Sequence, residues 1–264
     1  MSNGTQDMWN SRSDDYYGDI QIGIDMILNN PERAFPSLVW KMISTAFPDL
    51  RGRRVLVASS GDNIAAFGFH LLGADVTSCD FAERQLVNAK KIADRYGWNI
   101  RFLQQNSMYL EAIENEDYDL VYTSNGVHIW IPDLSEMYKN FYRVLKPGGR
   151  YIMFETHPFI RPFDDSGSEV IIDKPYEDVG PFISNVTEFA WRIQDIFNAL
   201  FDAEFNMRHM EEFHPERGDY DDWFYGNIEA GKADNFRRFD WKFNPWAALP
   251  QWIGFSAEKQ AEKT

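Results

Sequence analysis

The stretch VLVASSGD, residues 55–62, decides the fold. Its first four residues form a short apolar run of the kind found in a parallel strand that is buried on both faces. A polar turn with Gly61 follows, and Asp62 can cap a helix behind it. A buried strand that passes through a tight turn into a helix begins a βαβ unit, so the stretch predicts a parallel sheet.

Strand-like and helix-like segments continue to alternate toward the C-terminus. Amphipathic helices are expected after the first, second and fourth strands, and another is expected at residues 186–201. The sequence predicts the α/β class, with a Rossmann-like, doubly wound, mostly parallel seven-stranded sheet. The expected strands are residues 55–58, 74–79, 100–103, 118–122, 151–154, 205–213 and 252–257.

The chain is expected to divide into a lid and a sheet domain. Residues 1–50 precede the sheet and are expected to form an N-terminal helical lid over its carboxyl edge, with helices at 20–28 and 38–47. Residues 51–264 are expected to form the Rossmann-like domain. It carries two irregular segments that are expected to shape a substrate pocket. These insertions are residues 158–185, after the fifth strand, and 214–249.

Composition excludes several classes of function. The net charge is −15 and no basic stripe is visible, which argues against a nucleic-acid partner and against attraction to an anionic membrane surface. No stretch approaches the roughly 18 apolar residues that a membrane helix needs, and residues 1–10 do not read as a secretory signal. Cys79 is the one cysteine, which fits a reducing compartment. A cytoplasmic location is therefore expected.

A binding site is expected at the carboxyl ends of the strands, because ligands of open parallel sheets bind there. Asp80 ends the second strand and follows Gly61 by 19 residues. A carboxylate at this position can accept hydrogen bonds from both hydroxyls of a ribose. Asp80 also begins the sequence Asp-Phe-Ala-Glu, which resembles a capping box for the next helix, and the two roles are compatible.

The turn after the first strand contains one glycine where a dinucleotide fingerprint has three. The missing glycines count against NAD, because its pyrophosphate needs a close approach to the backbone. S-adenosylmethionine has no phosphate and offers an amino-acid end instead. Free amides at residues 61–63, at a helix N-terminus, are expected to meet its carboxylate.

Four segments in order resemble the motifs of class I S-adenosylmethionine-dependent methyltransferases. They are VLVASSGD (55–62), GADVTSCDF (73–81), YDLV with SNGVH (118–121 and 124–128), and RVLKPGGR (143–150). Each motif is loose alone, whereas four in the right order are specific. Within the family the chain looks closest to the small-molecule enzymes of ubiquinone and menaquinone biosynthesis.

The resemblance implies a set of cofactor contacts. Residues 59–61 would hold the methionine end of S-adenosylmethionine, Asp80 the ribose, and Phe81 the adenine. Asn125 and Gly126 would lie near the sulfonium, and aromatic lid residues would shield it, with Tyr16 or the adjacent Tyr17 as candidates. The full predicted cofactor set is Tyr16, Ser59, Ser60, Gly61, Asp80, Phe81, Gln85, Asn106, Ser107, Met108, Asn125 and Gly126.

Two departures from the family pattern affect the turn. The first strand normally ends with an acid that binds the methionine amine, but Val57 occupies that position, so Asp62 or a lid residue would have to replace it. Ser59 and Asn63 replace the first and last glycines of the turn. Asparagine tolerates positive φ better than most residues, so the turn is still expected to form.

His128 follows the fourth strand and is the candidate catalytic base for an acceptor that arrives protonated. The alternative is a histidine that is hydrogen-bonded at the start of the next helix. Glu155 and His157 are second-rank candidates. No metal site is expected, because His209 and His214 are five residues apart and so lie on opposite faces of a strand.

The sequence therefore predicts methyl transfer from S-adenosylmethionine to an oxygen, nitrogen or carbon atom of a small organic acceptor. The partners are expected to be that acceptor and neither nucleic acid nor membrane, and a homodimer is left open. Trp223 and Phe224 are expected to affect acceptor use more than cofactor affinity. The alternative is a non-catalytic or regulatory protein that binds S-adenosylmethionine on the same fold. A nucleotide-dependent oxidoreductase is disfavoured by the glycine pattern.

Overall fold

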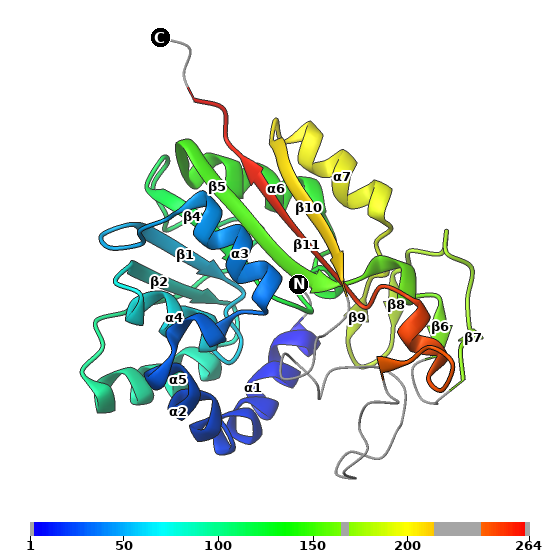
Figure 1. Ribbon diagram of the computed structural model, residues 1–264, viewed down its shortest axis with the longest axis horizontal. Coiled ribbons are helices and arrows are strands. Elements are labelled where there is room, and N and C mark those ends of the chain that lie inside the picture. Colours follow the sequence, from blue (N-terminus) through cyan, green and yellow to red (C-terminus); the bar gives the residue numbers. More distant parts are fainter. Residues whose placement is uncertain (1–2, 165–168, 214–238, 262–264) are drawn as a thin grey trace.

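A seven-stranded sheet forms the centre of the computed structural model, which describes residues 3–164, 169–213 and 239–261 (Figure 1). The strand order is β10-β11-β5-β4-β1-β2-β3. β11 is antiparallel to both of its neighbours, and the remaining pairs are parallel, as predicted. The strands are β1 (Arg54–Ala58), β2 (Asp75–Asp80), β3 (Arg101–Gln104), β4 (Tyr118–Thr123), β5 (Leu145–Thr156), β10 (Asn206–Phe213) and β11 (Trp252–Glu258).

Helices cover both faces of the sheet. Side chains alternate along β1, so Val55 and Val57 enter one core cluster while Leu56 and Ala58 enter the other. The first cluster lies under α2 (Gln21–Asn29), α3 (Ser37–Ala46), α4 (Ile64–Leu71) and α5 (Glu83–Tyr96). The second lies under α6 (Leu134–Val144) and α7 (Ile193–Asp202).

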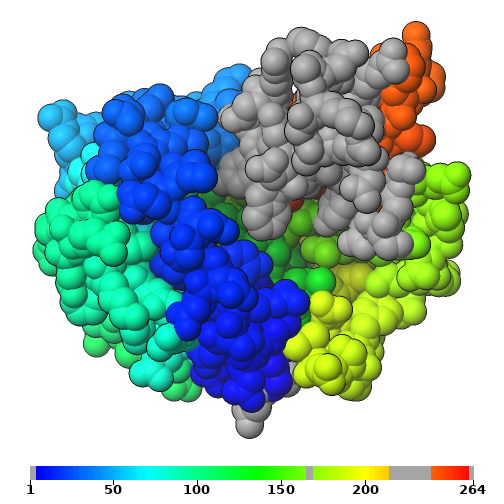
Figure 2. All heavy atoms as spheres, turned by 90° about the horizontal axis from the view of Figure 1, so that it is seen from below, coloured from blue at the N-terminus to red at the C-terminus, as the bar shows by residue number. Residues whose placement is uncertain are grey.

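The N-terminal region contains one helix more than the sequence predicts. The expected helices at 20–28 and 38–47 are confirmed as α2 and α3. The short helix η1 (Pro31–Ala34) lies between them. α1 (Asn3–Gly18) was not predicted, because it lacks a continuous apolar face. It crosses the carboxyl edge of the sheet beside α5, as Figures 1 and 2 show.

Polar contacts hold α1 on α5. Arg84 pairs with Asp14 at 2.7 Å, and Asn88 donates to the Ser13 hydroxyl at 3.0 Å. The Ser13 hydroxyl in turn donates to Oε1 of Gln85 at 3.2 Å. α1 is thus attached to α5 by polar contacts as well as by packing.

The segment after β5 departs most from the sequence prediction. Two short hairpins form there, and the predicted helix at 186–201 is wrong over its first seven residues, because α7 begins at Ile193. Thr187–Glu188 instead pairs with Phe182–Ile183, which uses the backbone groups that a helix would need. The hairpin strands are β6 (Phe163–Asp164), β7 (Ile171–Ile172), β8 (Phe182–Ile183) and β9 (Thr187–Glu188).

Candidate active site

The carboxyl ends of the central strands meet at one edge, where two neighbouring cavities open. The larger is about 520 Å³ and lies between the turn after β1 and the N-terminal helices. The smaller is about 70 Å³ and lies between that turn, the end of β2 and the loop after β4. Ser59, Gly61, Gln85 and Asn125 line both, so the two cavities form one continuous region around the turn.

The turn after β1 adopts the strained geometry that its sequence has to tolerate. Ser59 has φ 52° and Asn63 has φ 64°, both in the left-handed region. Hydrogen bonds from neighbouring elements hold these residues: the Ser59 and Ser107 hydroxyls lie 2.7 Å apart, and the Ser78 hydroxyl donates to the side-chain oxygen of Asn63. The prediction that the turn forms without its first and last glycines is confirmed.

Asp80 lies at the centre of the site. It is 5% exposed, its Oδ2 accepts from the Gly61 amide at 3.0 Å, and its Oδ1 accepts from the Ala82 amide at 2.8 Å. A carboxylate has about four acceptor positions, so two remain for a ligand. Burial raises the pKa of Asp80 to about 6, although the amide hydrogen bonds oppose the shift.

The predicted free amides of the turn need a correction. The Gly61 amide donates to Asp80 and the Asn63 amide donates to the Ser60 carbonyl, so neither is available to a carboxylate. The tight turn and the buried Asp80 consume them. Among the described residues, the Asp62 amide has no hydrogen-bond partner and remains for a ligand.

Aromatic side chains from α1 pack against the turn after β1 and line the larger cavity. The Tyr17 hydroxyl donates to the Gly61 carbonyl at 3.1 Å and accepts from the Asn63 amide group at 3.0 Å, so it bonds the lid directly to the turn. Burial raises the pKa of Tyr17 well above its usual value. Tyr16 is 41% exposed, stacks on Trp9 at 5.9 Å, and lines the larger cavity.

Trp9 and Trp130 belong to the site although the sequence analysis did not single them out. Trp9 lines both cavities and meets the ring of Trp130 edge-on at 5.8 Å. Trp130 comes from η2 (His128–Trp130), in the loop after β4. Trp9, Ser13 and Tyr16 share a helical face by their spacing, and this was the signal that could have located Trp9.

The remaining predicted cofactor residues are placed unevenly. Phe81 and Gln85 line the smaller cavity beside Asp80, whereas residues 106–108 are absent from the lining of either cavity. The Asn106 side-chain oxygen accepts from the Met108 amide at 3.0 Å, and Met108 is buried. Residues 106–108 thus shape the turn after β3 and support Ser59 from behind.

Glu155, at the end of β5, holds the loop after β4. Its carboxylate accepts from the amides of Gly126, Val127 and His128 at 2.6, 2.8 and 3.2 Å, and it is 2% exposed. Because Asn125 and Gly126 line the smaller cavity, Glu155 fixes this wall of the cavity. The sequence analysis made Glu155 only a second-rank candidate. The amides that it binds lie 27 to 29 residues away in the sequence, so no local pattern points to this role.

His128 lies behind this wall. It is 4% exposed, and its Nε2 lies 2.8 Å from the Tyr138 hydroxyl in α6. Among the described residues its Nδ1 has no hydrogen-bond partner, although Oε2 of Glu155 lies 4.0 Å away, and His128 lines neither cavity. Burial lowers the pKa of His128, so the ring is neutral at neutral pH.

Val57 is buried in the core, so the acid that is missing there has to be replaced from another element. The larger cavity offers the carboxylates of Asp19 and Asp62 for an ammonium group, and Arg33 for a carboxylate. Asp62 is exposed, so its carboxylate is accessible to a ligand. The predicted substitute Asp62 is therefore present at the cavity, together with Asp19 from the segment between α1 and α2.

Other expectations concern residues remote from this site. In the part of the chain that the structure describes, no three His, Cys, Asp or Glu side chains are grouped to hold a metal. His209 pairs with Glu211 on the exposed side of β10. His214, Trp223 and Phe224 lie outside the described residues. None of the described helices is long and apolar enough to cross a membrane.

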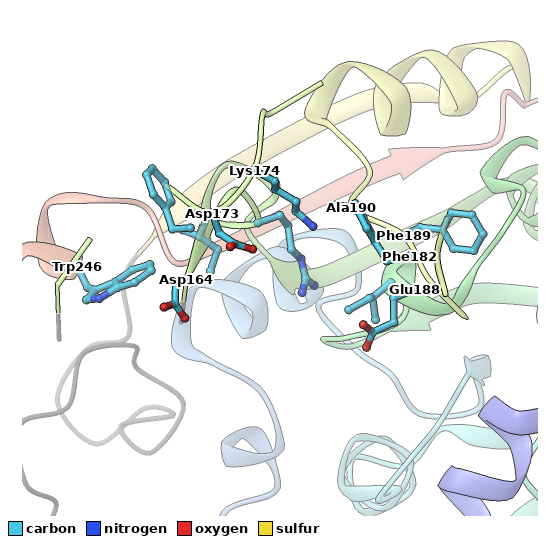
Figure 3. Close-up of a pocket in the computed structure, with 12 residues that line it drawn as sticks. Asp164, Asp173, Lys174, Phe182, Glu188, Phe189, Ala190 and Trp246 are labelled. Carbon is cyan, nitrogen blue, oxygen red and sulfur yellow. The ribbon is translucent and has the colours of Figure 1, made fainter. Parts of the chain in front are cut away.

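A further cavity of about 220 Å³ lies on the other side of η2 (Figure 3). Ile129 of η2 is part of its wall, and the other walls come from η3 (Pro158–Ile160), from Arg161 and from the segment with β6 to β9. Trp246, in η6 (Pro245–Ala248), closes one end. Residues of the segment 158–185 thus contribute walls to this cavity.

Comparisons with known proteins agree with this geometry. Residues 55–149 match a family model described as a methyltransferase domain. An uncharacterized methyltransferase of Bacillus subtilis (strain 168), YbaJ, is 28% identical over 174 residues, which cover 60% of this chain and 68% of the relative. A demethylmenaquinone methyltransferase of Lactococcus lactis is 35% identical over 123 residues, 44% of this chain and about half (46%) of the relative.

A solved structure has the same fold over most of the chain. The S-adenosylmethionine-dependent methyltransferase from Mesorhizobium loti superposes with a TM-score of 0.62 and 19% identity, covering 83% of this chain and 96% of that one. The likeness therefore extends well beyond the 55–149 region that matches the family model.

Proposed function

Since this chain belongs to the class I S-adenosylmethionine-dependent methyltransferases, we propose that it transfers a methyl group from S-adenosylmethionine to an oxygen, nitrogen or carbon atom of a small organic acceptor. S-adenosylmethionine supplies an electrophilic methyl group on a positive sulfonium. The chain's own residues then have to hold the cofactor, align the acceptor and exclude water.

The observation that carries the proposal is the position of Asp80. Its carboxylate is buried beside the smaller cavity, and the amides of Gly61 and Ala82 orient it while leaving acceptor positions for two ribose hydroxyls. Phe81 and Gln85 line the same cavity and offer a surface for the adenine. At the other end, Asp19 or Asp62 would take the methionine amine, and Asn125 and Gly126 would adjoin the sulfonium.

The proposed role of α1 is to shield the reacting atoms. Trp9 and Tyr16 present aromatic faces to the cavities, and aromatic faces attract a sulfonium as they attract other cations. The bond from Tyr17 to the Gly61 carbonyl would fasten the lid over the bound cofactor. A closed lid excludes water, which strengthens electrostatic contacts inside the site.

His128 remains the proposed base for an acceptor that arrives as a hydroxyl or a phenol. Its ring is neutral because burial lowers its pKa, and Nδ1 can accept a proton in the tautomer whose Nε2 donates to the Tyr138 hydroxyl. It lies behind the cavity wall, so this role requires the acceptor to enter beside Ile129. A His128→Asn variant separates the roles: a base would lower kcat for hydroxyl acceptors and leave S-adenosylmethionine affinity unchanged.

The test of the function is cofactor binding by an Asp80→Asn variant. The amide removes the negative charge and places a donor where the ribose hydroxyls donate. We expect the Kd for S-adenosylmethionine to rise at least about 100-fold, since two charge-assisted hydrogen bonds contribute roughly 1.5–3 kcal/mol each. Isothermal titration calorimetry measures the change.

The matched control is Asp75→Asn, at the exposed amino end of the same strand. It should leave the affinity unchanged. Equal affinities of the Asp80 variant and the wild type would contradict the proposed cofactor site. Formation of S-adenosylhomocysteine with a panel of acceptors then tests turnover.

The second candidate function is a binding or regulatory protein that holds S-adenosylmethionine without turnover. Val57 favours it, because the acid that normally orients the methionine end is replaced by a buried apolar residue. Tight binding of S-adenosylmethionine, without S-adenosylhomocysteine formation over a broad acceptor panel, would support this reading. We also propose that the protein works in the cytoplasm, because its single cysteine, Cys79, is buried and free.

A further inference from the structure

The cavity beyond η2 shares a wall with the proposed cofactor site. Val127, Trp130 and Ile131 line the smaller cofactor-side cavity, while Ile129 lines this one. The η2 turn is thus one residue layer between them. A ligand in the 220 Å³ cavity therefore lies next to the loop that the proposed function puts near the sulfonium.

Aromatic and charged side chains share the walls of this cavity. Phe163, Phe182, Phe189 and Trp246 line it from four different positions in the chain. The ring of Phe163 meets that of Trp246 edge-on at 6.0 Å, so these two form a continuous apolar surface. Aromatic walls of this kind bind a flat apolar body with little loss of side-chain entropy.

Two cations in the cavity lack strong carboxylate partners. The Arg161 side chain is 22% exposed and donates no hydrogen bond to any residue that the structure describes; its nearest carboxylate oxygen is Oε1 of Glu155, at 3.9 Å. Lys174 places its amine 3.6 Å from the centre of the Phe182 ring and forms no ion pair within the described ranges. Arg161 is one cause of the lowered pKa of Lys174, behind burial, so the two charges act on each other.

The charges of Asp178, Asp173 and Glu188 raise the pKa of Lys174 against the effect of burial, but none of these carboxylates forms an ion pair with it among the described residues. Asp173 is exposed, so water screens its charge. Figure 3 shows the carboxylates of Asp164 and Glu188 pointing away from the Lys174 amine. Glu155 already accepts hydrogen bonds from three loop amides, so a ligand can engage Arg161 without leaving Glu155 unpaired.

From this arrangement we propose that the cavity binds the methyl acceptor, and that the acceptor carries a carboxylate attached to an aromatic or similarly flat apolar body. Arg161 and Lys174 bind the carboxylate, and the aromatic walls hold the body against Ile129. The assignment as the acceptor site rests on the proposed methyltransferase function. The proposed binding of an anion in the cavity does not depend on that function.

The test uses three fluorinated probes of nearly equal shape on the full-length protein: 4-fluorophenylacetate, 4-fluorophenylacetamide and 4-fluorophenethylamine. Fluorine NMR line broadening gives the Kd of each. We expect the carboxylate to bind at least about tenfold more tightly than the amide, because hydrogen bonds to charged groups contribute more than neutral ones. The amine should bind most weakly.

Variants separate this site from others. Arg161→Gln should weaken binding of the carboxylate probe at least about tenfold, and Lys174→Gln about fivefold, with Arg161→Lys retaining part of the affinity. Arg101→Gln, on the exposed surface of β3, is the matched control and should change nothing. Thermal unfolding of each variant checks the fold, and Lys174→Gln carries the test if the Arg161 variants unfold.

Equal affinity for the acid and the amide, tighter binding of the amine, or an Arg161→Gln variant that behaves like Arg101→Gln would each overturn the proposal. Binding of S-adenosylmethionine is measured on the same samples. If the cofactor binds and the carboxylate probe does not, the cavity inference fails and the proposed function stands. If the probe binds and the cofactor does not, the anion site stands and its assignment to a methyl acceptor falls with the function.

Discussion

The two sides of η2 differ in how their polar groups are satisfied. On the cofactor side, Asp80, Asn63 and Tyr17 each bond to groups from another element, and the turn after β1 is held from three directions. On the other side, Arg161 and Lys174 have no hydrogen-bonded carboxylate partner among the described residues. The first region is preorganised before any ligand arrives, whereas the second retains charges that a ligand can satisfy.

This difference matches the ligands that we propose for the two regions. A cofactor is the same molecule in every turnover, so a rigid site with few adjustable groups binds it at the lowest entropic cost. An acceptor has to be distinguished from other small molecules. Charged side chains without a hydrogen-bonded partner can make this distinction, because a ligand that lacks the matching group leaves those side chains unsatisfied. The comparison therefore predicts different responses to mutation and to pH on the two sides.

The largest effect is expected at Glu155, which touches both regions. In Glu155→Gln the side-chain amide presents a donor to loop amides that are themselves donors, so at least one hydrogen bond becomes a repulsion. We expect unfolding free energy to fall by roughly 2 kcal/mol and S-adenosylmethionine affinity to fall about tenfold, measured by urea denaturation and calorimetry. The exposed Glu111→Gln is the control. If cofactor affinity survives intact, the loop after β4 does not form the wall of the cofactor site.

The pH dependence of ligand binding is expected to differ between the two sides. The pKa of Asp80 is about 6, and its charged form accepts the ribose hydroxyls, so affinity for S-adenosylmethionine should be constant above pH 7. It should fall about tenfold by pH 5, as the carboxylate takes up a proton. Probe binding in the second cavity should stay level over this range, because arginine and lysine remain charged.

An Asp80→Asn variant identifies the group that titrates. Its residual affinity for S-adenosylmethionine should not depend on pH between 5 and 7. A slope that persists in this variant would point to another carboxylate of the larger cavity, such as Asp62.

The smallest effect is expected at the lid. Tyr17→Phe removes the hydrogen bond to the Gly61 carbonyl and keeps the ring, so S-adenosylmethionine affinity should fall about fivefold, close to 1 kcal/mol. Tyr16→Phe is the matched control, since its hydroxyl has no hydrogen-bond partner among the described residues. Faster dissociation in stopped-flow measurements would account for the loss. Equal effects of the two variants would show that the lid does not depend on this bond.

Several features could be predicted from the sequence because they depend on local patterns. Period-two alternation and short apolar runs gave the seven strands, and the interval of 19 residues from Gly61 put Asp80 at the end of β2. The tolerance of Asn63 for positive φ is a property of that residue type, and the structure confirms it. Each of these inferences depends on a single strand, a single turn or a single sequence interval, and not on contacts between distant segments.

The remaining features depend on which elements meet. α1 has no marked apolar face, and only its contacts with α5 turn Trp9 and Tyr17 toward the turn. The helix expected at 186–201 begins only at Ile193, because Thr187–Glu188 forms strand hydrogen bonds with Phe182–Ile183 instead of helical ones. Likewise, the sequence does not tell whether Glu155 is a solvated residue at a strand end or a buried residue that binds a loop. The packing of the loop after β4 makes it buried.

The amino-acid sequence by itself determined the parallel sheet, the position of Asp80 and the family, since each is written in contiguous residues. The tertiary structure alone decided that His128 lies behind the cavity wall, that Glu155 bonds three loop amides, and that Arg161 and Lys174 face one cavity. The physical reason is that burial, hydrogen-bond partners and neighbouring charges are set by segments that are far apart in the chain. A residue's chemistry follows from them as much as from its type.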